Sequence, residues 1–306
     1  MSFWKESDKE KVDGLMNYAL HGWRTPVLKT PESVGLIYEE IFFPSMDGIP
    51  IEGWFIPGKS NRLIICNHFW PGNRYGFAGH LEDLGGFGGF EVNFLNYYKH
   101  LHDAGYNILT YDFRNHGLSG DANGRTFGLG LFEYRDVIGS LQYANSRPDT
   151  KKMEKGLMAI CVGCDAAIIG MNKHPEYFKD VKVMIGLQPV SARPFLEKSV
   201  ESMKLKTSTK EIVQYIDNKY YTTNGFHLDD LSPIKYAKSV TVPTKIFQLQ
   251  NDYRSDVDDV QAIYENLGSK EKELHWIEGS DERFSAYNYF GEFPELMLGW
   301  LAKYFN

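Results

Sequence analysis

Between residues 62 and 187, short apolar runs alternate with segments whose apolar residues repeat at helical spacing. The apolar runs cover 62–66, 106–111, 156–161 and 181–187, and the helical segments cover 90–102, 131–143 and 165–172. Parallel strands need long crossover connections, usually helices, and strands covered by helices on both faces are apolar throughout. The alternation therefore predicts an α/β fold with a doubly wound, mostly parallel sheet.

The alternation stops between residues 188 and 239. This stretch is charged and helix-prone, and Ser208, with Glu211 three residues later, forms a capping box that predicts the start of a helix. Beyond it the pattern resumes, with strands predicted at 245–249 and 273–277 and helices at 257–267 and 294–305. We therefore predict a core made of residues 1–187 and 240–306, with a helical cap inserted at 188–239.

The chain before residue 62 predicts two further features. Residues 1–36 form a helical lead-in that ends near two prolines. The runs 38–43 and 49–56 are rich in β-branched and aromatic residues and flank Asp47-Gly48. Two such runs around an Asp-Gly turn predict a β-hairpin ahead of the parallel sheet.

Charge and hydropathy exclude several classes of partner. The 33 Lys+Arg against 40 Asp+Glu give a net charge of -7, a sign that nucleic acids and anionic membranes repel. Mean hydropathy is -0.38, and no apolar run approaches the roughly 18 residues of a membrane-spanning helix. We therefore expect no nucleic-acid partner and no membrane association. A small-molecule substrate, neutral, acyl or carbonyl, stays open, and so does a homo-oligomer.

The cysteine content and the N-terminal residues indicate the cellular compartment of the protein. Cys66, Cys161 and Cys164 cannot form a disulfide framework, and the first residues lack a basic patch followed by an apolar core. These features predict a cytoplasmic protein. The glycine cluster at 85–89 has neither a GxGxxG register nor a Walker lysine, so we expect a mobile loop there and not a phosphate-binding site.

The most informative segment covers residues 156–167, Gly-Leu-Met-Ala-Ile-Cys-Val-Gly-Cys-Asp-Ala-Ala. A buried strand there passes through a tight turn directly into an Ala-rich helix. Small residues at Ala159 and Gly163 let the strand and the helix approach closely, so a strained turn would project Cys161 from the top of the sheet. Cys161 is therefore the candidate nucleophile.

In this segment the chain resembles the α/β-hydrolase family, whose Gly-x-Ser-x-Gly turn corresponds to Ala-Ile-Cys-Val-Gly here. The resemblance extends over nearly the whole chain after residue 36, through segments at 47–54, 67–72, 112–119 and 232–246. It implies Cys161 as nucleophile, the N–H groups of Phe69 and Val162 as oxyanion hole, and Asp252 as the acid. It also implies hydrolysis or acyl transfer without an external cofactor.

Glu282, in the segment 279–284, occupies the position where the family places its histidine. His275 lies inside the preceding predicted strand, where we expect a structural role. Two carboxylates beside Cys161 would disfavour its thiolate, and Asp252 and Glu282 would share a proton. A shared proton would make Glu282 a general base, which suits proton abstraction better than acyl transfer.

Three further residues are expected at the substrate pocket. His68 and Trp70 lie on the oxyanion loop, and Cys164 lies one turn into the helix that follows Cys161. The aromatic residues around this loop indicate an apolar substrate. His227 in the predicted cap is an alternative base that would reach down to the site.

Other interpretations of the same residues stay open. Cys161 can be a small buried residue in an elbow that has lost its chemistry, or one half of a Cys161-x-x-Cys164 redox pair. Glu282 can be a solvated loop residue paired with Arg283, and the acidic residues at 256–259 leave room for a shift in the assignment of Asp252.

The sequence thus leads to one main functional hypothesis and two alternatives. The main hypothesis is an enzyme that acts on an acyl, ester or thioester substrate through Cys161 with an atypical triad. The first alternative is non-hydrolytic proton chemistry, as in a cyclase or lyase, with Glu282 as base. The second is a binding protein that has lost catalytic turnover.

Overall fold

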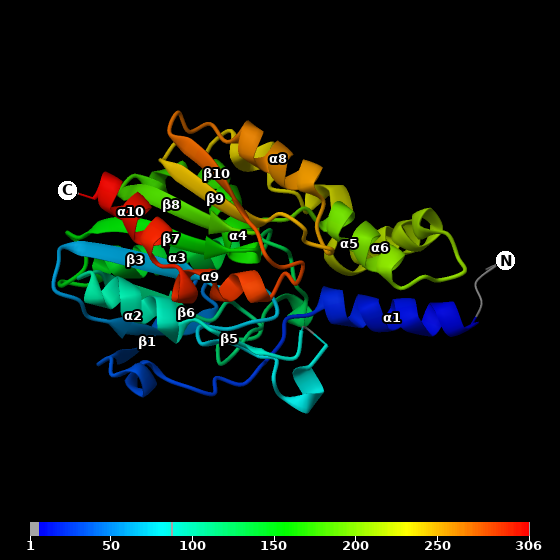
Figure 1. The fold of residues 1–306 in the computed structure, drawn as a ribbon, viewed down its shortest axis with the longest axis horizontal. Helices are drawn as coiled ribbons and strands as arrows, with labels where there is room; N and C mark the ends of the chain where they lie inside the picture. The colour runs from blue at the N-terminus through cyan, green and yellow to red at the C-terminus, as the bar shows by residue number, and fades with distance from the viewer. Residues whose placement is uncertain (1–5, 87, 306) are drawn as a thin grey trace.

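A computed structural model describes residues 6–86 and 88–305. Its main sheet has eight strands in the order β1-β2-β6-β3-β7-β8-β9-β10 (Figure 1). They are β1 (Glu39–Pro44), β2 (Pro50–Ile56), β3 (Arg62–Asn67), β6 (Asn107–Tyr111), β7 (Glu154–Ile160), β8 (Val181–Leu187), β9 (Thr244–Leu249) and β10 (Lys272–Ile277). All neighbours from β6 to β10 in this order pair in parallel. The predicted mostly parallel α/β sheet is confirmed.

The first two strands form the predicted hairpin. β1 and β2 pair antiparallel, with Phe43 opposite Ile51, and β2 pairs antiparallel with β6. Gly48 in the connecting turn has a φ of 85°, a backbone conformation that favours glycine. The hairpin therefore joins the parallel sheet through β2.

The segment predicted as one helix over residues 90–102 is divided in the structure. Its first part is β5 (Glu91–Asn93), which pairs with β4 (Gly76–Ala78) in a separate small sheet. The Asn93 side chain then accepts a hydrogen bond from the N–H of Leu95 at 3.1 Å, and α2 (Leu95–Asp103) begins. Helical spacing alone could not show where the extended segment ends.

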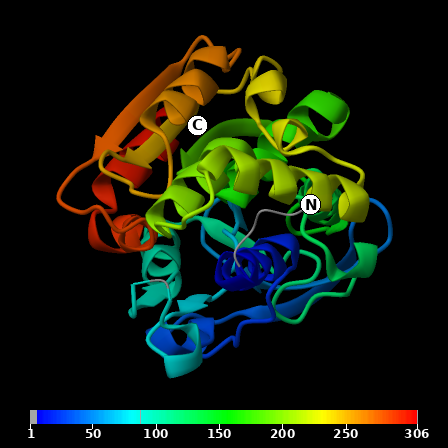
Figure 2. The ribbon, with the colours of Figure 1, turned by 90° about the vertical axis from the view of Figure 1, so that its right-hand side faces the viewer.

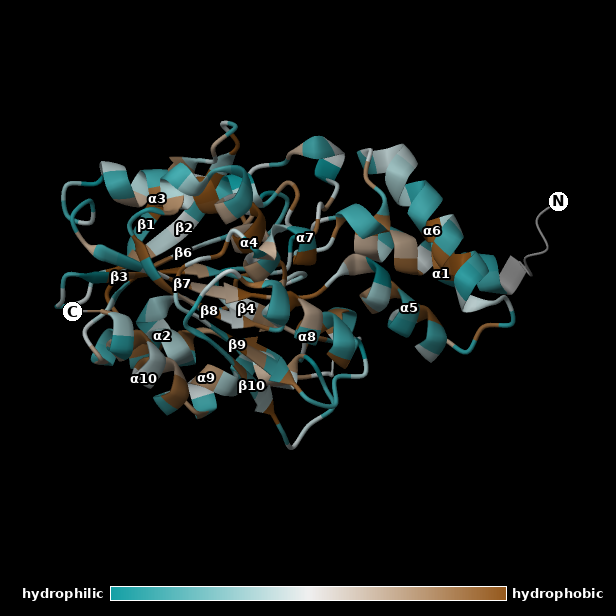
Figure 3. Cartoon of the chain, turned by 90° about the horizontal axis from the view of Figure 1, so that it is seen from above, coloured by the Kyte–Doolittle hydropathy of each residue, from teal (hydrophilic) through white to brown (hydrophobic). Residues whose placement is uncertain are grey.

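Helices cover both faces of the sheet and create two apolar cores. One core includes α3 (Tyr134–Ser146), α4 (Val162–Lys173) and α8 (Val257–Asn266), and the other includes α2, α9 (Tyr289–Glu292) and α10 (Glu295–Tyr304). Figure 3 shows hydrophobic residues along the central strands and hydrophilic residues on the outer side of α3. Each large apolar side chain that is fully buried in these cores contributes about 1.5–3 kcal/mol.

Three helices lie beyond the end of the sheet, as Figures 1 and 2 show: α1 (Glu6–Leu20), α5 (Ala192–Ser202) and α6 (Thr209–Asn224). The short α7 (Ile234–Ala237) leads back toward β9. α6 begins at the predicted capping box, where the Ser208 hydroxyl accepts from the N–H of Glu211 at 3.4 Å. The helix predicted to begin at Ser208 is therefore confirmed, with the Ser208 hydroxyl as its N-terminal cap.

The N-terminal helix is attached to α6. The Tyr215 hydroxyl donates to Asp13 at 2.9 Å, and the Tyr220 hydroxyl donates to the carbonyl of Ala19 at 3.1 Å. The carboxylate of Asp8 accepts three hydrogen bonds from Lys206 and Thr207. The division into core and cap at residues 188 and 239 stays a prediction, but α1 packs with the helices of the cap segment. Within the described residues, no helix is long and apolar enough to cross a membrane.

Candidate active site

Cys161 lies between the end of β7 and the start of α4, with φ 52° and ψ -117°. A backbone conformation of this kind costs a non-glycine residue on the order of 1–3 kcal/mol. The N–H of Cys161 donates to the carbonyl of Leu187 at 2.7 Å, which holds the turn against β8. A Cβ on Gly163 would lie 2.5 Å from the Asn67 carbonyl oxygen, so only glycine fits there. The strained turn predicted from the sequence is therefore present, with Cys161 at its apex.

Arg283 is the buried group that joins Cys161 to Asp252. Its guanidinium donates from Nη1 to the Asp252 carboxylate at 2.5 Å, from Nη2 to the Gln188 carbonyl at 2.5 Å, and from Nε to the Tyr287 hydroxyl at 2.9 Å. Arg283 and Tyr287 both form side-chain hydrogen bonds with Cys161. Arg283 is only 1% exposed, so its cation is held deep inside the site.

The electrostatics of Arg283 follow from these contacts. Burial alone would lower the pKa of Arg283, but the negative charges that Tyr287, Asp252 and Cys161 can carry raise it well above its ordinary value. Arginine therefore remains charged here and cannot accept a proton from a thiol. It can stabilise an anion but cannot act as a general base.

The structure does not bring Glu282 to Cys161, and this part of the sequence prediction is corrected. One oxygen of the Glu282 carboxylate accepts from the Tyr253 hydroxyl at 3.2 Å, and the other accepts from the N–H of Phe284 at 3.3 Å. The next residue, Arg283, is the one whose side chain contacts Asp252. A cation, and not a second carboxylate, therefore accompanies Asp252.

Asp252 is held by several donors besides Arg283. The Ser255 hydroxyl donates to its carboxylate at 2.7 Å, and the N–H of Arg254 donates at 2.9 Å. Asp252 is 7% exposed. The side chain that Asp252 contacts in the site is a guanidinium, and its role as the acid stays a prediction.

The two predicted oxyanion donors are held in different ways. Val162 is the first residue of α4, where a helix N–H has no intrahelical acceptor. The ring of Phe69 packs on Tyr287 with 4.2 Å between centroids, which fixes the loop that carries the Phe69 N–H. Both donors stay predictions.

Two of the three predicted pocket residues do not reach the cavity. The Nδ1 of His68 contacts the Phe69 carbonyl at 2.7 Å, and its Nε2 accepts from the N–H of Phe113 at 2.9 Å. Cys164 is fully buried, and its sulfur faces Gly186 in β8. Both residues support the fold. Trp70 does line the cavity.

Two buried histidines are expected to make the folded protein less stable as the pH falls. Burial lowers the pKa of His68 to about 4, and burial together with the charge of His68 lowers the pKa of His116 to about 3. Both values lie below the ordinary value of about 6.5, so the unfolded chain binds these protons first as the pH falls. Stability is therefore lost from about pH 6.5 downward, toward these lower values.

His116→Phe should reduce the loss of stability between pH 7 and pH 5 by about 1–2 kcal/mol, because one buried neutral imidazole is removed. Urea unfolding of both proteins at the two pH values measures this difference. An equal loss in the wild type and the variant would contradict a neutral, buried His116.

The other histidines considered from the sequence have local partners. His275 contacts the Tyr289 hydroxyl at 3.2 Å, and His227 contacts Asp217 at 3.0 Å. Neither residue lines the cavity beside Cys161. Across the described ranges, no imidazole is among the residues that line this cavity.

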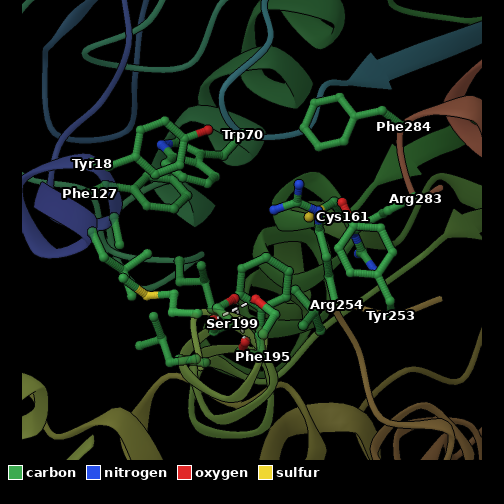
Figure 4. Close-up of a pocket in the computed structure, with 18 of the residues that line it drawn as sticks. Tyr18, Trp70, Phe127, Cys161, Phe195, Ser199, Tyr253, Arg254, Arg283 and Phe284 are labelled. Atoms are coloured by element: carbon green, nitrogen blue, oxygen red, sulfur yellow. Dashed lines mark hydrogen bonds between the residues drawn. The ribbon is translucent and has the colours of Figure 1, made fainter. Parts of the chain in front are cut away.

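A cavity of about 210 Å³ lies above Cys161. Figure 4 shows Cys161, Arg283 and Arg254 on one side and Tyr18, Trp70 and Phe127 on the other. Its walls come from α1, α5, α6 and the loops at the carboxyl ends of the strands. The residues that line it are Leu15, Tyr18, Ala19, Trp70, Phe127, Leu129, Cys161, Val190, Ala192, Phe195, Leu196, Ser199, Ser202, Met203, Tyr220, Tyr253, Arg254, Arg283, Phe284 and Tyr287. Most of these side chains are apolar or aromatic.

No group of three or more His, Cys, Asp or Glu side chains in the described part of the chain could hold a metal ion.

Sequence comparison gives one distant relative. No family model matches the chain. The uncharacterized protein YqkD of Bacillus subtilis is 23% identical over 235 residues, which cover 72% of this chain and 66% of that protein. The chain thus spans just under two thirds of the length of this relative.

Solved structures show the fold. An esterase of Pyrococcus furiosus superposes with a TM-score of 0.70 at 19% identity, covering 94% of this chain and 99% of that one. A dienelactone hydrolase of Anabaena variabilis has a TM-score of 0.56 at 15% identity, covering 88% and 99%. An esterase of Exiguobacterium antarcticum has a TM-score of 0.56 at 16% identity, covering 87% and 99%. The chain has the α/β-hydrolase fold, as the sequence motifs predict.

Proposed function

We propose that this protein is a hydrolase-type enzyme that forms an acyl-enzyme on Cys161 from an acyl ester or thioester substrate. The observation that carries the proposal is the contact of the strained Cys161 with Arg283 and Tyr287, at the base of an apolar cavity. Esterases with this fold provide the analogy for the substrate class.

The first step is formation of the nucleophile. A thiolate is the reactive form of cysteine, and a neighbouring cation or a helix N-terminus favours it. Arg283 provides a permanent positive charge, and α4 begins directly after Cys161. The thiol proton passes to solvent or to the leaving group, because no imidazole lines the cavity in the described residues.

The second step is acylation. The sulfur of Cys161 forms a bond to the substrate carbonyl carbon, the C–O or C–S bond to the leaving group breaks, and the leaving group takes a proton. The N–H groups of Val162 and Phe69 are the proposed donors to the oxyanion, and one such donor contributes about 3 kcal/mol to lowering the barrier.

Tyr287 is placed to assist this step. Its hydroxyl oxygen accepts from the Nε of Arg283 at 2.9 Å, so its own proton is directed to another acceptor. Its hydrogen bond with Cys161 makes the sulfur that acceptor. Tyr287 therefore supports the thiolate, and we assign it together with Arg283 to the catalytic group.

Deacylation lacks an evident base. Hydrolysis of an acyl-enzyme normally requires a group that removes a proton from water, and arginine cannot perform this role. The acyl-enzyme should therefore persist until a strong nucleophile, such as a second thiolate, accepts the acyl group. This favours acyl transfer over rapid hydrolysis.

Intact-mass spectrometry tests the proposal. Incubation with an activated octanoyl ester should add one octanoyl group per chain, located on Cys161 by peptide mapping. Cys161→Ala should remove the adduct. Cys66 and Cys164 are fully buried and serve as internal controls, since modification there would indicate non-specific acylation. A native protein that acquires no adduct on Cys161 would overturn the proposal.

A second candidate function is ligand binding without turnover. The absence of an imidazole among the described cavity-lining residues favours it, because the usual hydrolytic cycle cannot be completed. The proton-transfer alternative relied on Glu282 as base, and it loses support because the Glu282 side chain does not line the cavity.

A further inference from the structure

Helix α1 presents two apolar stripes with different surroundings. One stripe is buried in an apolar core and consists of Val12, Met16 and Leu20. The other contains Leu15 and Ala19, which are four residues apart and so share one side of the helix. Both are half-buried, and both line the cavity above Cys161. Since apolar side chains gain when an apolar ligand replaces water beside them, the second stripe offers a ligand an apolar wall.

Hydrogen bonds hold this wall in place. The Trp70 indole donates to the carbonyl of His21, just past the end of α1, at 3.1 Å. The Tyr220 hydroxyl donates to the carbonyl of Ala19 at 3.1 Å, and both donors belong to residues that line the cavity. Nearer the start of the helix, Asp13 accepts from α6 at 2.9 Å. A ligand that displaced α1 would have to break these hydrogen bonds.

Cys161 and α1 lie on opposite sides of the cavity. Figure 4 shows the sulfur of Cys161 on one side and Tyr18 of α1 on the other, with Phe195 and Ser199 of α5 below the space between them. All four residues line the same cavity. An acyl group attached to Cys161 therefore extends over α5 toward α1.

The volume of the cavity limits the size of this acyl group. An apolar cavity of about 150 Å³ binds benzene, which has six carbon atoms. The cavity above Cys161 has a volume of about 210 Å³, which at the same density corresponds to about eight carbon atoms. An acyl chain of this length would reach its limit at the wall formed by α1.

From these observations we propose that α1 sets the length of the acyl chain that the site accepts, with Leu15 and Ala19 as the specificity-determining residues. The inference rests on the proposed function, because it names which acyl groups the same site favours. A chain of about eight carbon atoms fills the space in front of these two side chains. A longer chain meets a helix that is held by hydrogen bonds, so its additional methylene groups gain no further burial.

Equilibrium binding of 1-alkanols with four to twelve carbon atoms tests this inference. These probes have no carbonyl group that Cys161 could attack, so the measurement does not depend on acylation. The change in tryptophan fluorescence on titration reports binding, because Trp70 lines the cavity. The affinity of the wild type should rise about four-fold for each added methylene group. It should level off beyond a chain of about eight carbon atoms.

Two variants should move this limit in opposite directions. Ala19→Phe fills part of the cavity, so the affinity should level off at a chain that is shorter by about three carbon atoms. Leu15→Ala removes three carbon atoms from the wall, so the limit should move to a chain that is longer by about two or three carbon atoms.

Each variant has a matched control outside the cavity lining. Asn17→Phe places the same ring on an exposed position of α1, and Leu28→Ala truncates a leucine that is 43% exposed. Neither Asn17 nor Leu28 lines the cavity. Both control variants should keep the wild-type limit.

The inference is overturned if the affinity of the wild type keeps rising through twelve carbon atoms, or if the alkanols do not bind saturably. It is also overturned if Asn17→Phe shifts the limit as far as Ala19→Phe does. Should one cavity variant fail to fold, the opposite shift in the other still decides the question. Failure to acylate Cys161 would reject the acyl-enzyme and leave the chain-length limit as a separate result.

Discussion

Asp252→Asn should lower the free energy of unfolding by about 3–5 kcal/mol, because it removes the carboxylate that pairs with the buried guanidinium of Arg283. Both side chains of this pair are 1% exposed, so water cannot replace the lost carboxylate. Urea denaturation at neutral pH measures the loss. The size of the effect depends on burial, since exposed ion pairs contribute only about 0–1 kcal/mol.

Two control variants separate this cause from a general effect of losing a carboxylate. Asp149→Asn breaks an ion pair with Arg147 in which the aspartate is 49% exposed, and it should change stability by less than about 1 kcal/mol. The double variant Asp252→Leu with Arg283→Met removes both charges and should recover most of the lost stability. If the double variant were as unstable as Asp252→Asn, an uncompensated charge would not be the cause.

The fold could be predicted from the sequence because its signals are local and repeated. Each buried strand of the parallel sheet is a short apolar run, and turns such as Asp47-Gly48 mark where the chain reverses. The strained turn at Cys161 was also predictable, since the small residues around it permit one close strand–helix packing. These features depend on few residues that are near one another in the sequence.

The place of Arg283 in the site could not be predicted from local sequence signals. Glu282 and Arg283 are neighbours in a loop, and which of them faces Cys161 depends on contacts with residues far along the chain. The Gln188 carbonyl and the Tyr287 hydroxyl accept from Arg283, while the Tyr253 hydroxyl binds Glu282. One signal was available: Arg283 is the basic residue in the segment 279–284, beside a predicted thiol nucleophile and an acid.

The attachment of α1 was missed for a related reason. The sequence predicts a helical lead-in but contains no local signal for its partner. Asp8 and Asp13 contact residues about 200 positions later, in and before α6. Leu15 and Ala19 consequently line the cavity, so a segment assigned to the core contributes to the wall of the cavity beside Cys161.

Arg283→His should convert a persistent acyl-enzyme into one that turns over. An imidazole at this position would have Asp252 to orient it and Cys161 beside it, and could remove a proton from the attacking water. General base catalysis of this kind contributes about 10²–10⁴-fold. The half-life of the octanoyl adduct, followed by intact-mass spectrometry, should fall by at least a hundred-fold, and the decay should slow below about pH 6.5 as the imidazole is protonated.

Two companion variants make this result specific to position 283. Arg283→Gln removes the cation without supplying a base, so its adduct should persist, and acylation itself should slow because the thiolate loses its countercharge. Glu282→His places an imidazole one residue earlier, where the native side chain contacts Tyr253 and the N–H of Phe284, and it should not shorten the half-life. If Glu282→His accelerated decay while a folded Arg283→His did not, residue 282 would face the sulfur, and the assignment of Arg283 to the site would have to be abandoned.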